Sequence, residues 1–176
     1  MTERLRPTTF ERAALTGSYV YEFTVCGFVG WLYEVTVMYV MYHSYEERGY
    51  LHLPILPIYG FFGLILVAVF RKRSNVLLVF FASMAITTAG ELAASYIIEA
   101  VIHEQLWSYH MWRFNFQGRI SLYSSLMFGG LSVLLVKAVH PLIRLMHKHL
   151  PEAVSLGLGI ACLTMIGTDL LMTLKG

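Results

Sequence analysis

The sequence predicts an all-α fold, a polytopic bundle of about five transmembrane helices. The chain is 57% hydrophobic and only 14% charged, whereas an ordinary soluble domain has roughly 25% charged residues. The apolar residues come in blocks long enough to span a bilayer, without the alternating pattern of a transmembrane barrel. Helices are therefore the structure that satisfies the backbone of these blocks in lipid.

Five apolar stretches have approximately the length that a membrane helix needs. They cover about 18–41, 51–70, 76–102, 120–139 and 153–174. Nothing in the composition marks a second domain, so we expect residues 1–176 to form a single integral membrane domain. In the second stretch, Pro54 and Pro57 restrict the backbone, which predicts an irregular beginning and a helix that starts at Pro57. An ordinary proline-led helix start is the alternative.

The positive charges fall into two groups that predict the orientation of the chain. Nine Lys and Arg residues lie in the N-terminal arm, the 71–75 turn and the 140–152 loop with its flank. Four lie in the 42–50 loop, the 103–119 segment and the tail. Because positive residues accumulate in cytoplasmic loops, we expect a multi-pass protein of the cell membrane with a cytoplasmic N-terminus and an external C-terminus.

The segment 103–119, between the third and fourth stretches, is neither a span nor an ordinary loop. It alternates polar residues with five aromatic ones, namely Trp107, Tyr109, Trp112, Phe114 and Phe116. Aromatic side chains of this kind collect at the headgroup level of a bilayer. We expect an interfacial aromatic belt or, alternatively, a lid that packs over the bundle.

Two glutamates lie deep inside the apolar stretches, where an ionised carboxylate costs several kcal/mol. Glu34 shares a helix face with Gly30 and Trp31, and small residues on such a face direct it toward neighbouring helices rather than lipid. Glu91 lies near the middle of the third stretch. Glu99 follows two turns later and could border the same cavity. The centre of the bundle is therefore the expected functional site.

Three further residues complete this expected polar site. Arg119, at the start of the fourth helix, is the best candidate counter-charge for Glu34 or Glu91, because a guanidinium can hold a carboxylate bidentately. Asn115 lies close to it in sequence, and Tyr59 would present its hydroxyl near the proline-broken start of the second helix. The alternative for Arg119 is to extend toward lipid headgroups.

The remaining ionisable residues predict less. Glu22 lies near the predicted cytoplasmic boundary and Asp169 near the chain end, so we expect solvated or interfacial positions for both. The seven histidines lie in or beside predicted loops without a zinc-binding spacing, and neither a P-loop nor a G-x-S-x-G motif occurs. We therefore expect no metal, no cofactor, no nucleic-acid partner and no enzymatic activity.

Several short fragments follow one another in a fixed order along residues 27–141. They are Gly30-Trp31-x-x-Glu34, Arg48-Gly49-Tyr50-Leu51, Pro57-Ile58-Tyr59-Gly60, Glu91, Leu106-Trp107-x-Tyr109, Phe114-Asn115-x-x-Gly118-Arg119-Ile120-Ser121-Leu122, Gly129 and His140-Pro141. Together they resemble a family of small integral membrane proteins classed as ABC-transporter permeases of the CmpB type. The fifth stretch lies outside this resemblance.

The resemblance implies a shared site of five residues, namely Glu34, Tyr59, Glu91, Asn115 and Arg119. It also implies a permease that lacks an ATPase domain and depends on a separate energising partner. The chain departs from the family pattern at Leu53, Ser108 and Phe128, where a glycine, an aspartate and a tryptophan are usual. The loss of the aspartate argues against an acidic role for that loop.

Three functions from different classes fit these observations. The first is a transport-related permease or small carrier subunit, whose carboxylates bind a cation or exchange protons. The second is a non-transporting structural or regulatory membrane protein that binds a partner through its glycine faces. The third is an intramembrane lipid-modifying enzyme, for which no nucleophile arrangement is present. Expected partners are the lipid bilayer, an ATPase or other membrane subunit, and further copies of the chain.

Overall fold

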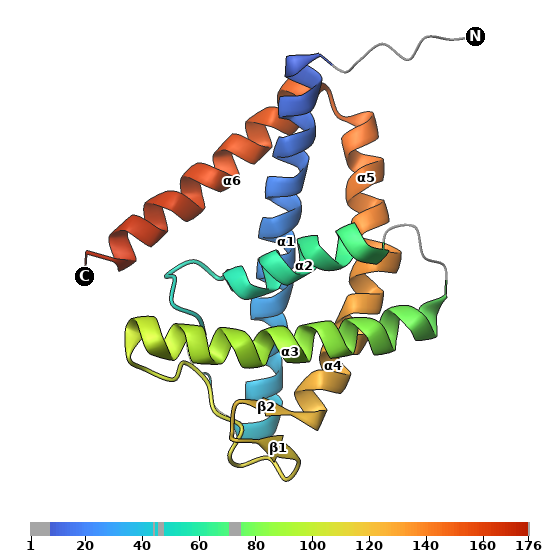
Figure 1. Cartoon of the computed structure of the whole chain (residues 1–176). Helices are drawn as coiled ribbons and strands as arrows, with labels where there is room; N and C mark the ends of the chain where they lie inside the picture. Colours follow the sequence, from blue (N-terminus) through green and yellow to red (C-terminus); the bar gives the residue numbers. More distant parts are fainter. Residues whose placement is uncertain (1–7, 44, 46–47, 71–74, 176) are drawn as a thin grey trace. The chain divides into compact units, whose positions relative to one another are not determined.

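The computed structural model describes residues 8–43, 45, 48–70 and 75–175. Within them the fold is all-α, as predicted, apart from one two-stranded hairpin (Figure 1). The elements are α1 (Thr9–Tyr42), α2 (Pro57–Phe70), α3 (Val76–Ile102), β1 (Asn115–Phe116), β2 (Ile120–Ser121), α4 (Leu122–Leu134), the π-helical turn η1 (Leu135–Val139), α5 (His140–His149) and α6 (Glu152–Thr173). Four helices are long and apolar enough to cross a membrane, namely Thr9–Val40, Val76–Ile102, Leu122–His149 and Glu152–Thr173.

The chain divides into two compact units. Unit 1 combines the residues up to Ile65 with those from His140 onward, and unit 2 comprises Leu66–Val139. The single integral membrane domain that the composition suggests stays a prediction.

In unit 1, helices α1 and α6 pack through small residues near their N-terminal ends. A Cβ on Gly159 would lie 2.3 Å from the Cα of Gly17, and the Ser155 hydroxyl donates to the carbonyl of Ala14 at 3.1 Å. Small residues allow membrane helices to approach this closely. The two helices therefore start side by side, after which α6 diverges from α1 (Figure 1).

Helix α5 contacts the same part of α1 and runs in the opposite direction. The predicted loop over 140–152 is wrong, because α5 is helical over His140–His149 and extends the preceding helix. The π-helical turn η1 ends at Val139, two residues before Pro141. A proline removes one N–H and clashes with the carbonyl four residues earlier, and a π-helical turn accommodates such an interruption within a helix.

Residues 51–56 form an irregular segment that is buried within unit 1. Its buried side chains are Leu51, Ile55 and Leu56. The N–H of Leu56 donates to the carbonyl of Gly27 at 3.1 Å, and the N–H of Leu53 donates to the Asp169 carboxylate at 3.0 Å. Irregular backbone is tolerated at membrane depth where protein groups satisfy it in this way. The helix starts at Pro57, as predicted, so the expected span over 51–70 is helical only over its last 14 residues.

In unit 2, helices α3 and α4 pack through a face rich in hydroxyl groups. The buried residues of α3 recur every four positions, at Val79, Ser83, Thr87, Glu91 and Ser95. On α4 the buried residues are Ser124, Ser125, Gly129 and Ser132. The hydroxyl of Thr88 donates to that of Ser125 at 2.7 Å. Such contacts hold membrane helices together where hydrophobic attraction between them is weak.

The segment between α3 and α4 folds back along α3. Strands β1 and β2 pair antiparallel, with Asn115 opposite Ser121. On the inner side, Tyr109 and Arg119 bond to side chains of α3. On the outer side, Met111, Phe114 and Phe116 are exposed. The inner contacts fit the lid alternative, and the exposed aromatics fit the interfacial belt.

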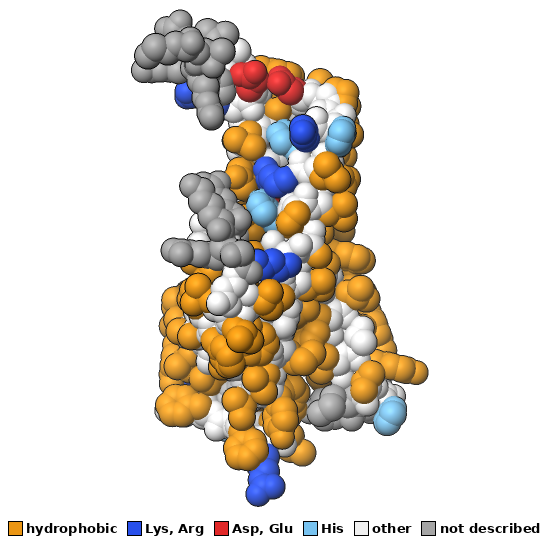
Figure 2. Space-filling view, turned by 90° about the vertical axis from the view of Figure 1, so that its right-hand side faces the viewer, with side chains coloured by type: hydrophobic (Ala, Val, Ile, Leu, Met, Phe, Trp, Pro, Cys, Tyr) orange, Lys and Arg blue, Asp and Glu red, His pale blue; other side chains and the backbone are white. Residues whose placement is uncertain are grey.

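Large hydrophobic side chains cover the outer surface of the helices. Exposed examples are Phe61, Leu77, Phe81, Leu145 and Leu171. In Figure 2, hydrophobic side chains cover most of the lower half of the face, and most of the charged and histidine side chains lie in the upper half. A water-soluble protein rarely exposes so much apolar surface, whereas lipid-facing helices require it. The protein is therefore a multi-pass membrane protein.

Candidate functional site

Glu34 lies in the second half of α1 and accepts a hydrogen bond from the hydroxyl of Tyr59 at 2.9 Å. Gly30, one turn earlier, leaves room for the tyrosine, because a Cβ there would lie 2.1 Å from the ring's Cγ. The positive charge of Arg48 also acts on Glu34. Trp31 stacks on a neighbouring phenylalanine of α1 rather than on the carboxylate. Glu34 and Tyr59 thus meet within unit 1, with a cation that sequence reasoning did not place there.

Glu91 is buried on α3 and accepts a hydrogen bond from the hydroxyl of Tyr109 at 2.8 Å. Tyr109 is held by its backbone N–H, which donates to the carbonyl of Gly118 at 2.7 Å. Its ring also contacts Trp112, with 5.0 Å between the centroids. The aromatic segment therefore delivers a hydroxyl to the middle of α3.

Arg119 forms its ion pair with Glu99. The guanidinium also donates to the hydroxyl of Ser95 at 2.8 Å and stacks over the ring of Tyr96, 4.1 Å from the centroid. The structure pairs Arg119 with Glu99, two turns beyond Glu91 on α3, and the expected pairing with Glu34 or Glu91 stays a prediction. The physical reason for the pair with Glu99 is the hairpin, which places Arg119 beside the C-terminal part of α3.

Asn115 and Trp107 stabilise the fold of the same segment. The amide of Asn115 donates to the carbonyl of Trp112 at 2.6 Å and accepts from the N–H of Gly118 at 2.9 Å, which closes the turn. The indole N–H of Trp107 donates to the carbonyl of Arg119 at 3.0 Å. Asn115 and Trp107 therefore serve the local fold of this segment.

Two of the five predicted site residues, Glu34 and Tyr59, lie in unit 1, and the other three lie in unit 2. The structure joins Glu34 to Tyr59 within the first unit. In the second it places Glu91, Asn115 and Arg119 on α3 and the segment that follows it. A single shared site formed by all five stays a prediction.

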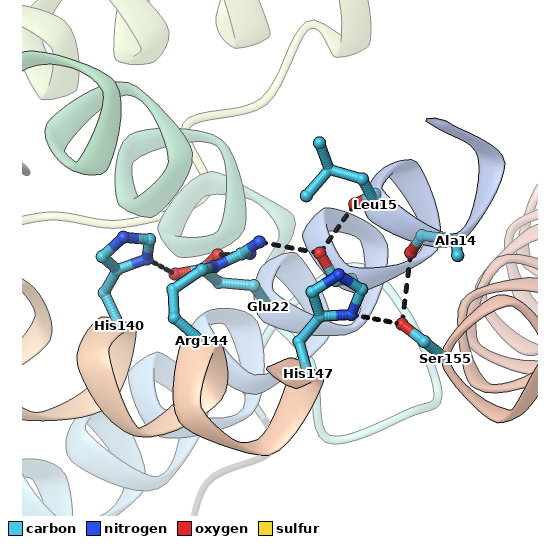
Figure 3. Close-up of polar contacts among 8 residues, drawn as sticks. Ala14, Leu15, Glu22, His140, Arg144, His147 and Ser155 are labelled. Atoms are coloured by element: carbon cyan, nitrogen blue, oxygen red, sulfur yellow. Dashed lines mark hydrogen bonds and ion pairs between the residues drawn. The ribbon is translucent and has the colours of Figure 1, made fainter. Parts of the chain in front are cut away.

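Sequence reasoning missed a polar cluster around Glu22 (Figure 3). The side chain of Glu22 is fully buried in α1, contrary to the expected solvated position. One carboxylate oxygen lies 2.5 Å from Nδ1 of His140, and the other accepts from the guanidinium of Arg144 at 2.6 Å. The second guanidinium nitrogen donates to the hydroxyl of Ser18 at 2.8 Å. A buried carboxylate thus has a charged partner and a hydrogen-bond partner, as burial requires.

Two serines connect this cluster to the backbone of α1. The hydroxyls of Ser18 and Ser155 each donate to a carbonyl oxygen of α1, so each is left to accept from α5. Ser18 accepts from Arg144, and Ser155 lies 2.8 Å from Nδ1 of His147 (Figure 3). Because the single hydroxyl proton of Ser155 is already used, Nδ1 of His147 carries the proton of that bond.

The signal for this cluster is a helical spacing. His140, Arg144 and His147 are separated by four and three residues, and Ser18 and Glu22 by four. Each set therefore shares one helix face. Because residues 140–152 are predicted as a loop, the spacing of His140, Arg144 and His147 is not recognised as a shared helix face.

Asp169 is also buried, contrary to the expected interfacial exposure. Its carboxylate accepts from the backbone N–H of Leu53 at 3.0 Å and lies 3.1 Å from Nδ1 of His52. Asp169 thereby satisfies the irregular segment before α2, which has no helical hydrogen bonds of its own.

The comparisons with known proteins place the chain in one family. No curated protein and no solved structure matches the sequence. The model of one family matches residues 21–174. The match therefore extends beyond residues 27–141 and includes α6, which the fragment pattern left outside. The chain belongs to the family described as "Putative ABC-transporter type IV".

Proposed function

We propose that this protein is a permease or small carrier subunit of the cell membrane, in which Glu34 and Glu91 bind a cation or exchange protons during transport. Family membership and the apolar helices support a transport-related membrane protein. The observation that carries the finer proposal is the pairing of each carboxyl group with a tyrosine hydroxyl, Glu34 with Tyr59 and Glu91 with Tyr109. Ionisable groups at such positions usually mark ion or proton pathways.

The tyrosines suit this role because a neutral hydroxyl orients a carboxylate without adding charge. The hydroxyl can donate to the ionised form or accept from the protonated form. Tyr59 comes from the first turn of α2 and Tyr109 from the segment after α3. Each contact therefore depends on a tyrosine that lies outside the four long apolar helices.

The energy source lies outside this chain in our proposal. Since the sequence has no P-loop, a separate ATPase or an ion gradient would drive transport. The geometry of unit 1 supports the expected orientation of the chain, in which the N-terminus is cytoplasmic. The C-terminal end of α5, which is rich in basic residues, and the N-terminal end of α1, which carries Arg12 beside Glu11, lie together at the start of α6. Positive segments on one side fit a cytoplasmic position for both.

The test uses everted membrane vesicles from native cells, so that natural partners are present, energised with ATP. Proton movement is followed with a trapped pH-sensitive dye, and sodium with a radioactive tracer. Glu34→Gln and Glu91→Gln should each slow protein-dependent flux at least about tenfold, equivalent to about 1.4 kcal/mol in barrier height. Glu104→Gln, which neutralises an exposed acid in the segment after α3, is the matched control and should retain flux.

Unchanged flux in both variants, with normal insertion into the membrane, would overturn the proposal. Reduced thermal stability without any change in flux would instead support a structural role for the two carboxylates.

A further inference from the structure

The carboxylate of Glu22 has two partners of different character. Arg144 supplies a permanent positive charge to one oxygen and is sufficient to neutralise the buried anion. His140 bonds to the other oxygen. Histidine is the side chain whose charge changes near neutral pH. The arrangement therefore combines a fixed ion pair with a titratable group, which a purely structural pair would not need.

Exposure indicates where a proton can reach this cluster. The side chain of Glu22 is 0% exposed, that of His140 is 12% exposed and that of Arg144 is 24% exposed. An arginine does not release its proton in proteins. His140 is therefore the route by which a proton reaches the cluster.

The ring orientation identifies the atom that receives the proton. Paired with Arg144, the Glu22 carboxylate acts as an acceptor, so Nδ1 of His140 donates to it. A proton that arrives from outside binds to Nε2, on the other side of the ring. His140 then becomes an imidazolium, and no other bond changes.

The surroundings favour this assignment. The side chains of α1 that face the cluster are Ser18, Tyr19, Tyr21 and Cys26, and Tyr19 stacks under Arg144 with 4.3 Å to the ring centroid. From α5 and α6 they are His147 and Ser155, which bond to each other. His147 is therefore engaged with Ser155 rather than with the Glu22 carboxylate.

We propose that Glu22 and His140 form a binding site for one exchangeable proton, supported by Arg144. In the proton-free state the cluster contains one ion pair. In the protonated state the same carboxylate serves two cations, the Arg144 guanidinium and the His140 imidazolium. The use of this proton in transport rests on the proposed function, whereas its binding does not.

The experiment measures proton binding on the purified full-length protein in lipid nanodiscs. Imidazole nitrogens are labelled with ¹⁵N, and the His140 signal is identified by its loss in His140→Gln. It is then followed between about pH 5 and pH 9, the range in which histidine changes charge. The wild-type signal should titrate. In Glu22→Gln the His140 signal should no longer follow the wild-type titration curve, because the counter-charge is lost.

Glu152→Gln is the control, since it removes an exposed carboxylate at the start of α6 and should leave the His140 titration in place. Glu22→Asp is the second variant if Glu22→Gln does not fold. It keeps the charge, withdraws it from His140 by one methylene and should change the His140 titration curve less than Glu22→Gln does. A His140 signal that does not titrate, or that titrates identically in the Glu22 variants, would overturn the proposal. Transport is not required, so a failure of the proposed function leaves these outcomes intact.

Discussion

Individual residues decide how Glu34 meets its tyrosine. The ring of Tyr59 occupies the space that a side chain at Gly30 would need, and its hydroxyl lies 2.9 Å from the carboxylate. Gly30 therefore acts on Glu34 indirectly, through the position of the ring.

We expect Gly30→Ala to displace the Tyr59 hydroxyl from Glu34, to lower stability and to slow the proposed flux. The new Cβ would lie 2.1 Å from Cγ of the ring, and overpacking of this kind costs about 1–3 kcal/mol. Thermal unfolding in detergent and flux in vesicles measure the two effects. Gly130→Ala is the control, because no described atom beyond its chain neighbours and its own helix backbone lies within 4 Å of its Cβ position. Equal stability of Gly30→Ala and Gly130→Ala would contradict the close contact.

At the scale of elements, the contact between α1 and α6 depends on one of two neighbouring glycines. Gly159 faces the backbone of Gly17, whereas Gly157 has no described atom within 4 Å of its Cβ position beyond its chain neighbours and its own helix backbone. We expect Gly159→Ala to lower the free energy of unfolding by about 1–3 kcal/mol, because backbone cannot rotate away from the added methyl group. Gly157→Ala should be neutral or stabilising by up to about 1 kcal/mol, because alanine favours helix.

A double-mutant cycle identifies the cause. A Cβ on Gly17 would lie 2.8 Å from the carbonyl oxygen of Ser155, so Gly17→Ala forces the same helices apart. Once they have separated, the second methyl group adds little, and Gly17→Ala with Gly159→Ala should cost less than the sum of the single changes. Additive costs would place the two glycines in independent contacts.

The sequence predicts the elements of this fold better than their boundaries and contacts. Apolar length identifies α1, α3, α4 and α6, and Pro57 marks the start of α2 correctly. The extension through α5 is hidden because Pro141 and a charged, histidine-rich segment resemble a loop. Its polar residues face α1, and residues such as Leu142 and Leu145 face outward. Polar side chains on the inner face and apolar ones on the outer face suit a helix that is surrounded by lipid.

In the candidate site, too, the sequence predicts the residues better than their contacts. Composition and position single out Glu34 and Glu91, but their tyrosine partners depend on how distant segments fold back. Arg119 is recognisable as a partner for an acid, yet only the hairpin determines that the acid is Glu99. Glu22 appears exposed when its own helix is considered alone, because its partners lie 118 and 122 residues away.

At the scale of the whole molecule, the number of membrane crossings depends on α2. Its 14 residues extend about 21 Å at 1.5 Å per residue, short of the roughly 30 Å of a hydrocarbon core. The buried segment 51–56 precedes α2 and has protein partners for its N–H groups at Leu53 and Leu56. We therefore expect this segment and α2 to cross the membrane together, which makes five crossings.

Single cysteines distinguish five crossings from four. In a background with alanine at both native cysteines, the introduced positions are Tyr45→Cys, Glu104→Cys, Glu152→Cys and Lys175→Cys, all of them exposed. With a cytoplasmic N-terminus and five crossings, a membrane-impermeant maleimide should label positions 45, 104 and 175 on intact cells. Position 152 should react only after permeabilisation. If α2 does not cross, positions 45 and 152 become accessible together from one side, and 104 and 175 from the other. That pattern would show that α2 does not cross the membrane.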